Sequence, residues 1–286
     1  MEKSNGTKKH KLLDRPILGY FILVLFCLLA EQVGGLLDSL LAAVLPEYGT
    51  ERVLFTGTTI VSASGIFTAF AAVVAALLYK GWFKPDYQGC FVRDRFKQGI
   101  SYLLIFLLIH ISGSIVSLCS FGIGKPLIAA LWCLAPGFGE EITFRGLGVA
   151  NYMRTIKDEK KIPIIFWLSS LVFGLIHIAN VLAGASVTNS VIQAVYAVGV
   201  GMLFGAVYLR TGNLWPTIIA HSLVDFAEMC RADVSQSGGV MVQIGVGDWI
   251  TTVAGVFAAI LGLYLVRKQK YGDIMQVWSE RWNKAE

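Results

Sequence analysis

Long apolar runs, separated by short charged segments, set the strongest limit on how this chain of 286 residues can fold. Runs of about 17 to 25 apolar residues can cross the hydrocarbon core of a bilayer as helices. The mean hydropathy is +0.64 and only 15% of the residues are charged, far from the balance of a soluble domain. The chain is therefore predicted to be an all-α polytopic membrane protein with about eight transmembrane helices. The predicted spans are residues 16–45, 54–79, 99–121, 126–152, 163–181, 187–209, 213–230 and 249–266.

Two of these spans contain residues that are unusual in a membrane helix. The first includes EQVGGLLDS, residues 31–39, and is predicted to be either long and tilted or locally broken. The fourth includes APGFGEE, residues 135–141, where Pro136 lacks a backbone donor and is expected to bend or restart the helix. Such a bend would free backbone groups beside Glu140.

Lys and Arg residues are distributed unevenly between the two ends of the spans. If the N-terminus is inside, 20 of the 24 Lys and Arg residues lie in inner segments, and only Arg52, Lys125 and Arg231 lie in outer ones. The positive-inside rule then predicts that both termini are cytoplasmic. The net charge of +5 reflects this orientation and an attraction to anionic lipid. No nucleic-acid motif is present, so the bilayer is an expected partner and nucleic acid is not.

The chain has no detectable internal repeat and no long linker, so residues 1–286 are predicted to form a single helical membrane domain. Outside the spans, residues 86–98 and 271–284 mix aromatic with basic side chains. Both segments are predicted to be helices at the membrane interface.

Three charged side chains interrupt the fourth span in the stretch GEEITFRG, residues 139–146. An ionisable residue near the bilayer centre costs about 2.5–3.5 kcal/mol on insertion scales, so each one needs a partner or a function. Glu141 and Arg145 are four residues apart and are predicted to pair on one helix face. Glu140 is rotated by about 100° from Glu141 and cannot use Arg145 with the same geometry.

Later spans carry further ionisable side chains. His177 follows Phe173 by one helical turn, and His221 precedes Asp225 by one turn. The estimated depth of these residues matches that of Glu140, so they are predicted to converge. The alternative is a buried ion network that only sets helix register. His110, alone in the third span, is interpreted as a packing or hydrogen-bonding group.

Three short motifs carry a resemblance to a known family. EEITFR matches EExxxR, FGLIH matches FxxxH and HSLVD matches HxxxN/D, in the order of the CAAX-protease and bacteriocin-processing (CPBP) family of intramembrane proteases. This family includes the type II CAAX prenyl endopeptidases. The resemblance covers residues 126–230, which are predicted to form the catalytic core, and the eight predicted spans resemble the family's architecture.

The resemblance implies a role for each matched residue. Glu140 resembles the general base that activates water, and Glu141 with Arg145 resembles a supporting pair. His177 and His221 are expected to orient the water or stabilise the oxyanion. Asp225 is expected to hydrogen-bond His221, and it occupies a position that is Asn in other members.

Two cofactor alternatives follow from the same residues. Two histidines and a glutamate could form a His₂Glu zinc site, and the family is often catalogued as metalloproteases. The chain has no HExxH motif, and a glutamate-activated water needs no metal. The favoured prediction is therefore that no residue binds a metal or another cofactor, with zinc as the alternative.

The predicted function is hydrolysis of a peptide bond in a membrane-associated, prenylated or precursor peptide. The resemblance suggests bacterial peptide processing or bacteriocin self-immunity at the plasma membrane. The alternatives are a transporter or proton relay, and an immunity or scaffold protein that keeps the motifs for structure. The lack of an inverted repeat argues against a standard secondary transporter. The sequence predicts no oligomeric state.

Overall fold

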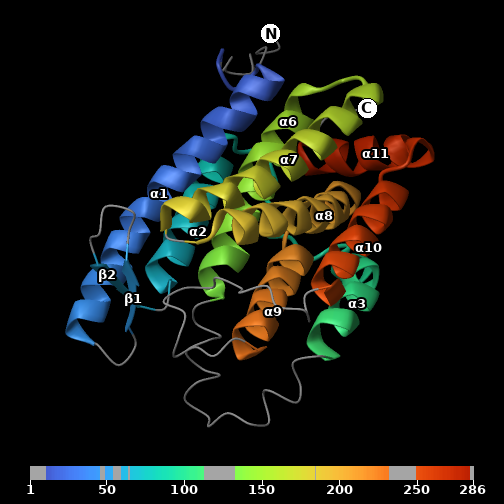
Figure 1. Cartoon of the computed structure of the whole chain (residues 1–286). Coiled ribbons are helices and arrows are strands. Elements are labelled where there is room, and N and C mark those ends of the chain that lie inside the picture. The colour runs from blue at the N-terminus through green and yellow to red at the C-terminus, as the bar shows by residue number, and fades with distance from the viewer. Residues whose placement is uncertain are drawn as a thin grey trace.

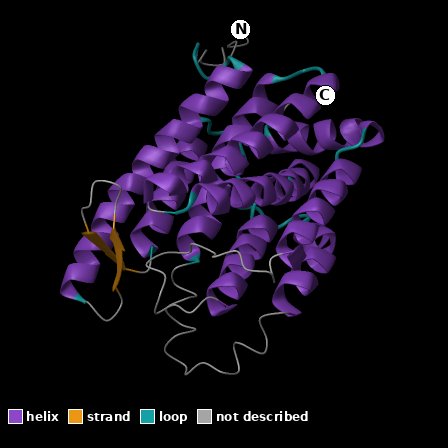
Figure 2. Ribbon diagram, viewed as in Figure 1, coloured by secondary structure: helices purple, strands orange, loops and turns teal. Residues whose placement is uncertain are grey.

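The computed structural model describes residues 11–45, 49–53, 59–63, 65–112, 133–183, 185–231 and 249–283. Within these ranges the chain is almost entirely helical, with one small β-hairpin (Figures 1 and 2). The helices are α1 (Pro16–Val44), α2 (Ile66–Trp82), α3 (Phe96–Ser112), η2 (Ala135–Val149), α6 (Ala150–Thr155), η3 (Glu159–Lys161), α7 (Ile162–Ile176), η4 (His177–Ala183), α8 (Val187–Thr211), α9 (Trp215–Arg231), α10 (Trp249–Leu265), η6 (Lys268–Lys270) and α11 (Tyr271–Arg281). The strands are β1 (Gly49–Val53) and β2 (Thr59–Ala63).

Several helices are apolar enough to cross a bilayer, which confirms a helical integral membrane protein. Three are also long enough by themselves, namely Pro16–Val44, Glu159–Leu182 and Val187–Thr211. Ile66–Trp82, Phe96–His110 and Val253–Leu265 are shorter apolar helices. The total of about eight spans stays a prediction, because part of the third span and the start of the fourth lie outside the described residues.

The second predicted span begins too early in the sequence. Residues 59–63 form strand β2, which pairs antiparallel with β1 from Gly49↔Ala63 to Val53↔Thr59. The β-branched run Thr59, Ile60 and Val61 favours a strand over a helix. Helix α2 therefore starts only at Ile66, directly after Gly65, whose φ of 61° lies in the left-handed region that suits glycine.

The charged stretch of the first span does not break α1, which is continuous over 29 residues. Asp38 is buried and accepts hydrogen bonds from the backbone N–H groups of Phe67 and Thr68, at 3.1 and 3.0 Å. Those two donors belong to the first turn of α2 and have no partner within that helix. Asp38 thus caps the neighbouring helix, and Gly34 allows the two backbones to approach at the same point.

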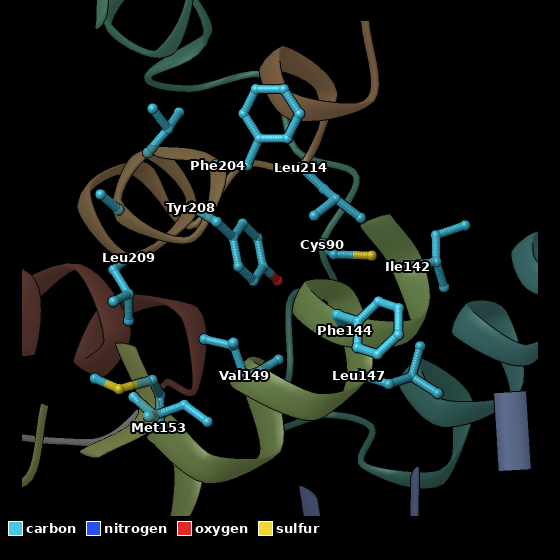
Figure 3. Close-up of a cluster of buried hydrophobic side chains, with 14 of the residues drawn as sticks. Cys90, Ile142, Phe144, Leu147, Val149, Met153, Phe204, Tyr208, Leu209 and Leu214 are labelled. Carbon is cyan, nitrogen blue, oxygen red and sulfur yellow. The ribbon is translucent and has the colours of Figure 1, made fainter. Parts of the chain in front are cut away.

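Helix η2 lies at the centre of the fold, packed by α1, α2, α7 and α9. It is a π-helix of 15 residues, far longer than the single π-turns common in proteins. Every residue from Glu141 to Val149 is buried, whereas α1 and α2 expose large apolar side chains such as Leu29 and Leu77. Figure 3 shows Phe144, Leu147 and other η2 side chains in the hydrophobic core beside α8.

The start of η2 at Ala135 agrees with the predicted restart at Pro136, and residues 126–132, against which a bend would be seen, lie outside the described residues. Pro136 stands in the first turn, where its missing N–H would have had no helical partner. The helix then runs to Val149 with wider turns and without a break. The wide turns change the angular spacing of the residues that follow.

The predicted interfacial segments differ from each other. Residues 86–95 form a loop and not a helix, since Gly89 has a φ of 93° and Arg95 a φ of 56°. The predicted C-terminal helix is present as α11, but Trp278 donates from Nε1 to the carbonyl of Leu209 and Trp282 donates to that of Ala150. The apolar face of α11 therefore packs on the protein, and its predicted position at the membrane interface stays a prediction.

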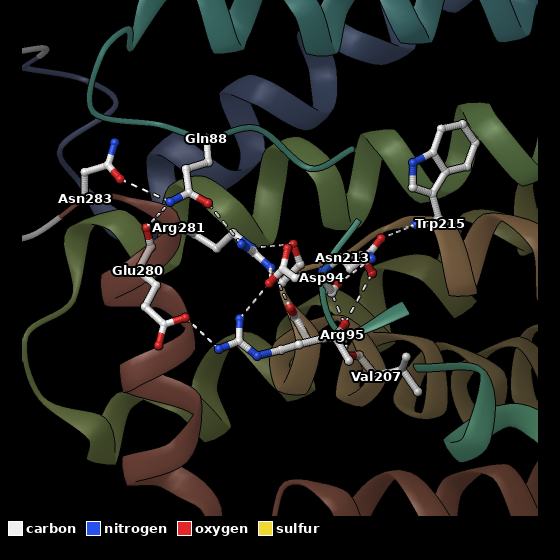
Figure 4. Close-up of polar contacts among 11 residues, drawn as sticks. Gln88, Asp94, Arg95, Val207, Asn213, Trp215, Glu280, Arg281 and Asn283 are labelled. Atoms are coloured by element: carbon white, nitrogen blue, oxygen red, sulfur yellow. Dashed lines mark hydrogen bonds and ion pairs between the residues drawn. The ribbon is translucent and has the colours of Figure 1, made fainter. Parts of the chain in front are cut away.

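Arg281 joins α11 to two loops (Figure 4). Its guanidinium donates to the carbonyl oxygens of Thr211 and Gly212, at 3.1 and 2.9 Å, and to Oε1 of Gln88 at 3.0 Å, and it pairs with Asp94. An arginine with four partners can be buried at low cost, because its donors stay satisfied. These contacts hold the segments before α3, after α8 and at the C-terminus together.

Candidate active site

The first part of the site comes from η2 and α9, which meet at two small residues. Gly137 packs on Ser222 so closely that an added Cβ would overlap the hydroxyl oxygen. Ser222 also donates to the carbonyl of Cys133, at 3.2 Å. Because His221 precedes Ser222, this close approach brings the imidazole toward the two glutamates of η2.

Glu141, Arg145 and His221 form a buried ion network. Oε1 of Glu141 accepts from Nη1 of Arg145 at 2.9 Å and from Nδ1 of His221 at 3.0 Å. Glu141 and Arg145 are fully buried, with 0% of either side chain exposed. The predicted pair is confirmed, and its geometry shows that Glu141 also orients the imidazole. A charge-assisted bond of this kind fixes both the tautomer and the ring plane.

Phe173 supports the same network from α7. The guanidinium carbon of Arg145 lies 4.1 Å from the centre of the Phe173 ring, in cation–π geometry. Edge contacts connect this ring to His177 and His221, with centroid distances of 5.2 and 5.9 Å. Nη2 of Arg145 also donates to the carbonyl of Gly201, at 3.4 Å. The phenylalanine of FGLIH therefore serves as a platform for the arginine, a contact that the sequence did not predict.

Glu140 is the more accessible of the two adjacent glutamates. Its side chain is 30% exposed, and its Oε2 lies 3.8 Å from Nε2 of His221. Glu140 is thus close to the histidine without a direct hydrogen bond to it. The Oε2 atom at this spacing is buried and has no hydrogen-bond partner among the described residues, so it retains an unused acceptor beside His221.

Asp225 does not orient His221 in the predicted manner. Its Oδ2 lies 3.6 Å from Nε2 of His221, beyond the range of a hydrogen bond. The orienting bond comes from Glu141 on the opposite ring nitrogen. The prediction failed because spacing along one helix identifies side chains that share a face, but cannot identify a stronger acceptor on another helix.

His177 lies at the junction of α7 and η4, and its Nδ1 is 2.8 Å from the carbonyl of Phe173. With the proton on Nδ1, that bond directs Nε2 away from the helix. Asp225 interacts electrostatically with His177, His221, Glu140 and Glu141. The structure thus brings Glu140, Glu141, Arg145, His221 and Asp225 into one network, with His177 joined through Phe173 and through charge.

His110 stays outside this network. Its ring nitrogens lie 3.1 Å from the carbonyl of Phe106 and 2.7 Å from the hydroxyl of Tyr196. The side chain is buried and both nitrogens have partners. The interpretation of His110 as a hydrogen-bonding and packing group is confirmed.

The zinc alternative requires two histidines and a glutamate that face one point. Among the described residues, no three His, Cys, Asp or Glu side chains are grouped so that they could hold a metal ion. Oε1 of Glu141 and Nδ1 of His221 are engaged with each other and with Arg145. Nε2 of His221 instead faces Glu140 and Asp225, at 3.8 and 3.6 Å.

Comparison with known families supports the resemblance seen in the motifs. Residues 122–227 match the family model described as Type II CAAX prenyl endopeptidase Rce1-like. The matched segment includes all six candidate residues, from Glu140 to Asp225. No curated protein and no solved structure matches the chain significantly.

Proposed function

Starting from the Rce1-like type II CAAX prenyl endopeptidase domain at residues 122–227, we propose that this membrane protein is an intramembrane endopeptidase that uses a glutamate-activated water. One observation carries the assignment of the base. Glu141 is fully buried and held by Arg145, whereas Glu140 is partly exposed beside Nε2 of His221. Glu140 is the carboxylate of the motif that can reach both water and substrate.

In this mechanism Glu140 accepts a proton from water while the oxygen attacks the scissile carbonyl carbon. The carbon–oxygen double bond opens to an oxyanion, and Nε2–H of His221 or His177 stabilises the new charge. That donor requires the doubly protonated ring, because Nδ1 of each histidine already donates, to Glu141 or to the carbonyl of Phe173. Glu141 keeps the His221 ring in place through Nδ1. Glu140 then gives its proton to the leaving nitrogen as the peptide bond breaks. Phe173 and Arg145 keep Glu141 in position throughout.

The substrate that we propose is a membrane-associated peptide, such as a prenylated or precursor peptide. A site built on a buried central helix favours substrates that already lie at the bilayer. We place the protein in a bacterial plasma membrane with both termini cytoplasmic, in peptide processing or bacteriocin self-immunity. Support for that setting comes from the family resemblance and from the Lys and Arg distribution.

The test compares purified wild-type protein with Glu140→Gln in nanodiscs. Cleavage of a peptide library that includes lipidated peptides is followed by mass spectrometry, with and without a chelator. We expect wild-type cleavage that survives chelation, and a loss of about 10²–10⁴-fold in Glu140→Gln, which keeps size but loses the base. Chelator-sensitive cleavage would favour the zinc alternative over a metal-free mechanism. No cleavage by folded wild-type protein would favour the transport or immunity alternatives.

A further inference from the structure

A third glutamate, Glu31 of α1, approaches the site from outside the matched segment. It lies within the apolar span Pro16–Val44, where an ionisable side chain costs about 2.5–3.5 kcal/mol on insertion scales. The burial of Asp38 in the same helix is explained by its role as the cap of α2, but Glu31 caps no helix. Within the described ranges, no Lys, Arg or His side chain forms an ion pair with Glu31.

The contacts of Glu31 are with η2. Its Oε1 accepts a hydrogen bond from Oγ1 of Thr143 at 2.5 Å, a length typical of a hydroxyl that donates to a carboxylate. Cys27, one turn earlier in α1, donates more weakly to the same oxygen from Sγ at 3.6 Å. Thr143 is fully buried and follows Glu140 by three residues. The bond therefore ties α1 to η2 close to the proposed base.

Gly139 makes the second contact possible. A Cβ added at this position would lie only 3.3 Å from the carboxyl carbon of Glu31, so the carboxylate rests on the backbone next to Glu140. Glu31 and Glu140 are also close enough to interact electrostatically. Glu31 thus contacts η2 on both sides of Glu140, at Gly139 and at Thr143.

We propose that Glu31 is a positioning residue for the endopeptidase reaction, an inference that rests on the proposed function of Glu140. By holding the segment from Gly139 to Thr143, it sets the place of the Glu140 carboxylate relative to His221. A π-helix of this length is rare. Contacts from neighbouring helices, such as those of Glu31, therefore help to fix where its side chains lie. A misplacement of about 1 Å at a reacting group can cost about 10²-fold in rate.

The experiment measures kcat and KM of folded protein for Glu31→Ala, Glu31→Gln, Thr143→Ala and the double variant Glu31→Ala/Thr143→Ala. We expect Glu31→Ala to lower kcat by at least about tenfold with little change in KM. Glu31→Gln keeps an acceptor for Thr143 and should restore most of the rate. The double variant should be no slower than Glu31→Ala alone, because the two side chains act as one unit.

Asp38→Asn provides the matched control, since it alters another carboxylate of α1 that bonds to a neighbouring helix. It should lower thermal stability and leave kcat unchanged. A wild-type kcat in Glu31→Ala would overturn the proposal, as would equal losses in Glu31→Gln and Glu31→Ala. Additive losses in the double variant would overturn it as well.

A second readout does not depend on cleavage. The alkylation rate of a cysteine placed by Glu140→Cys is compared with Glu31 present and with Glu31→Ala added, because thiol reactivity follows the local environment. We expect the rate to change with Glu31→Ala and not with Asp38→Asn. Unchanged alkylation contradicts the positioning role. Changed alkylation without any wild-type cleavage would contradict the proposed function and a role of Glu31 in that reaction, and would show only that Glu31 positions residue 140.

Discussion

Glu140 and Glu141 are neighbours in the chain, yet their surroundings differ. Glu141 has no exposed surface and shares one oxygen between Arg145 and His221, whereas Glu140 keeps 30% of its side chain exposed. A buried charge that loses its partner pays the full cost of desolvation, while an exposed one remains hydrated. The two glutamates should therefore respond differently to substitution.

Arg145→Met should destabilise the protein by about 3–5 kcal/mol, because Glu141 would be left as an uncompensated buried charge. Thermal unfolding in detergent checks this expectation. The matched control is Arg95→Met, which removes partly exposed ion pairs with Asp94 and Glu280. That change should cost no more than about 1 kcal/mol. Equal destabilisation by the two variants would contradict the special role of the buried pair.

His221→Ala and Asp225→Asn should distinguish a side chain that stabilises the oxyanion, His221, from a carboxylate that only lies nearby, Asp225. His221 forms a hydrogen bond with Glu141 and lies beside Glu140. Its loss should therefore lower the cleavage rate by about 10²-fold or more. Asp225 lies 3.6 Å from His221, and asparagine at this position should retain part of the activity. Initial rates with one peptide substrate give the comparison. Complete loss in both variants would mean that the Asp225 carboxylate acts in the reaction itself.

At the scale of elements, the site depends on how closely α9 approaches η2. Gly137 packs against Ser222, the residue after His221. Two helices that meet at small residues approach more closely than larger side chains allow. The position of His221 relative to Glu140 is thus set by a contact that contains neither residue.

Gly137→Ala should separate the two helices and reduce both stability and kcat, since the new methyl would overlap Ser222. Gly81→Ala is the matched control, because an added Cβ in α2 meets nothing within 4 Å. Alanine is favoured over glycine in a helix by about 1 kcal/mol, so the control should be neutral or slightly stabilising. Melting curves and kcat for the two variants test this pair of expectations. A Gly137→Ala enzyme with normal kcat would show that this close contact does not place His221.

At the scale of the whole molecule, the described parts of the predicted inner segments contact one another. Asp14 pairs with Arg154 at 2.8 Å, and Arg210 pairs with Asp273 at 3.1 Å. Arg281 joins the loop before α3 to the segment after α8. Segments on opposite sides of a membrane could not touch. The contacts are therefore consistent with the prediction that these segments lie on the same side.

Labelling with a membrane-impermeant thiol reagent should reveal which side this end faces. We expect Lys157→Cys, in a cysteine-free background, to react only when the cytoplasmic face is accessible. Glu51→Cys, in the segment that follows α1, should react from outside. The reverse pattern would place both termini on the outer side and contradict the positive-inside prediction.

Several features could be predicted from the sequence alone because they depend on local order. Apolar runs predict membrane helices, and the four-residue spacing of Glu141 and Arg145 predicts their pair. The three motifs identify the family segment, since they lie within residues 122–227. The strand at residues 59–63 and the loop at residues 86–95 are predicted wrongly, because apolar length and aromatic content are interpreted as helix. The β-branched residues at 59–61 are the local signal for the strand.

Only the tertiary structure decided how these side chains are connected. In the structure His221 is oriented by a hydrogen bond to Glu141 and not by Asp225. The guanidinium of Arg145 lies over the ring of Phe173, and Glu31 of α1 accepts a hydrogen bond from Thr143 of η2. The physical reason is that a membrane span requires only a long apolar run, which can be read from the sequence. A buried polar group requires a partner at hydrogen-bond distance. That partner can come from any helix, so it is determined by the packing of the whole bundle.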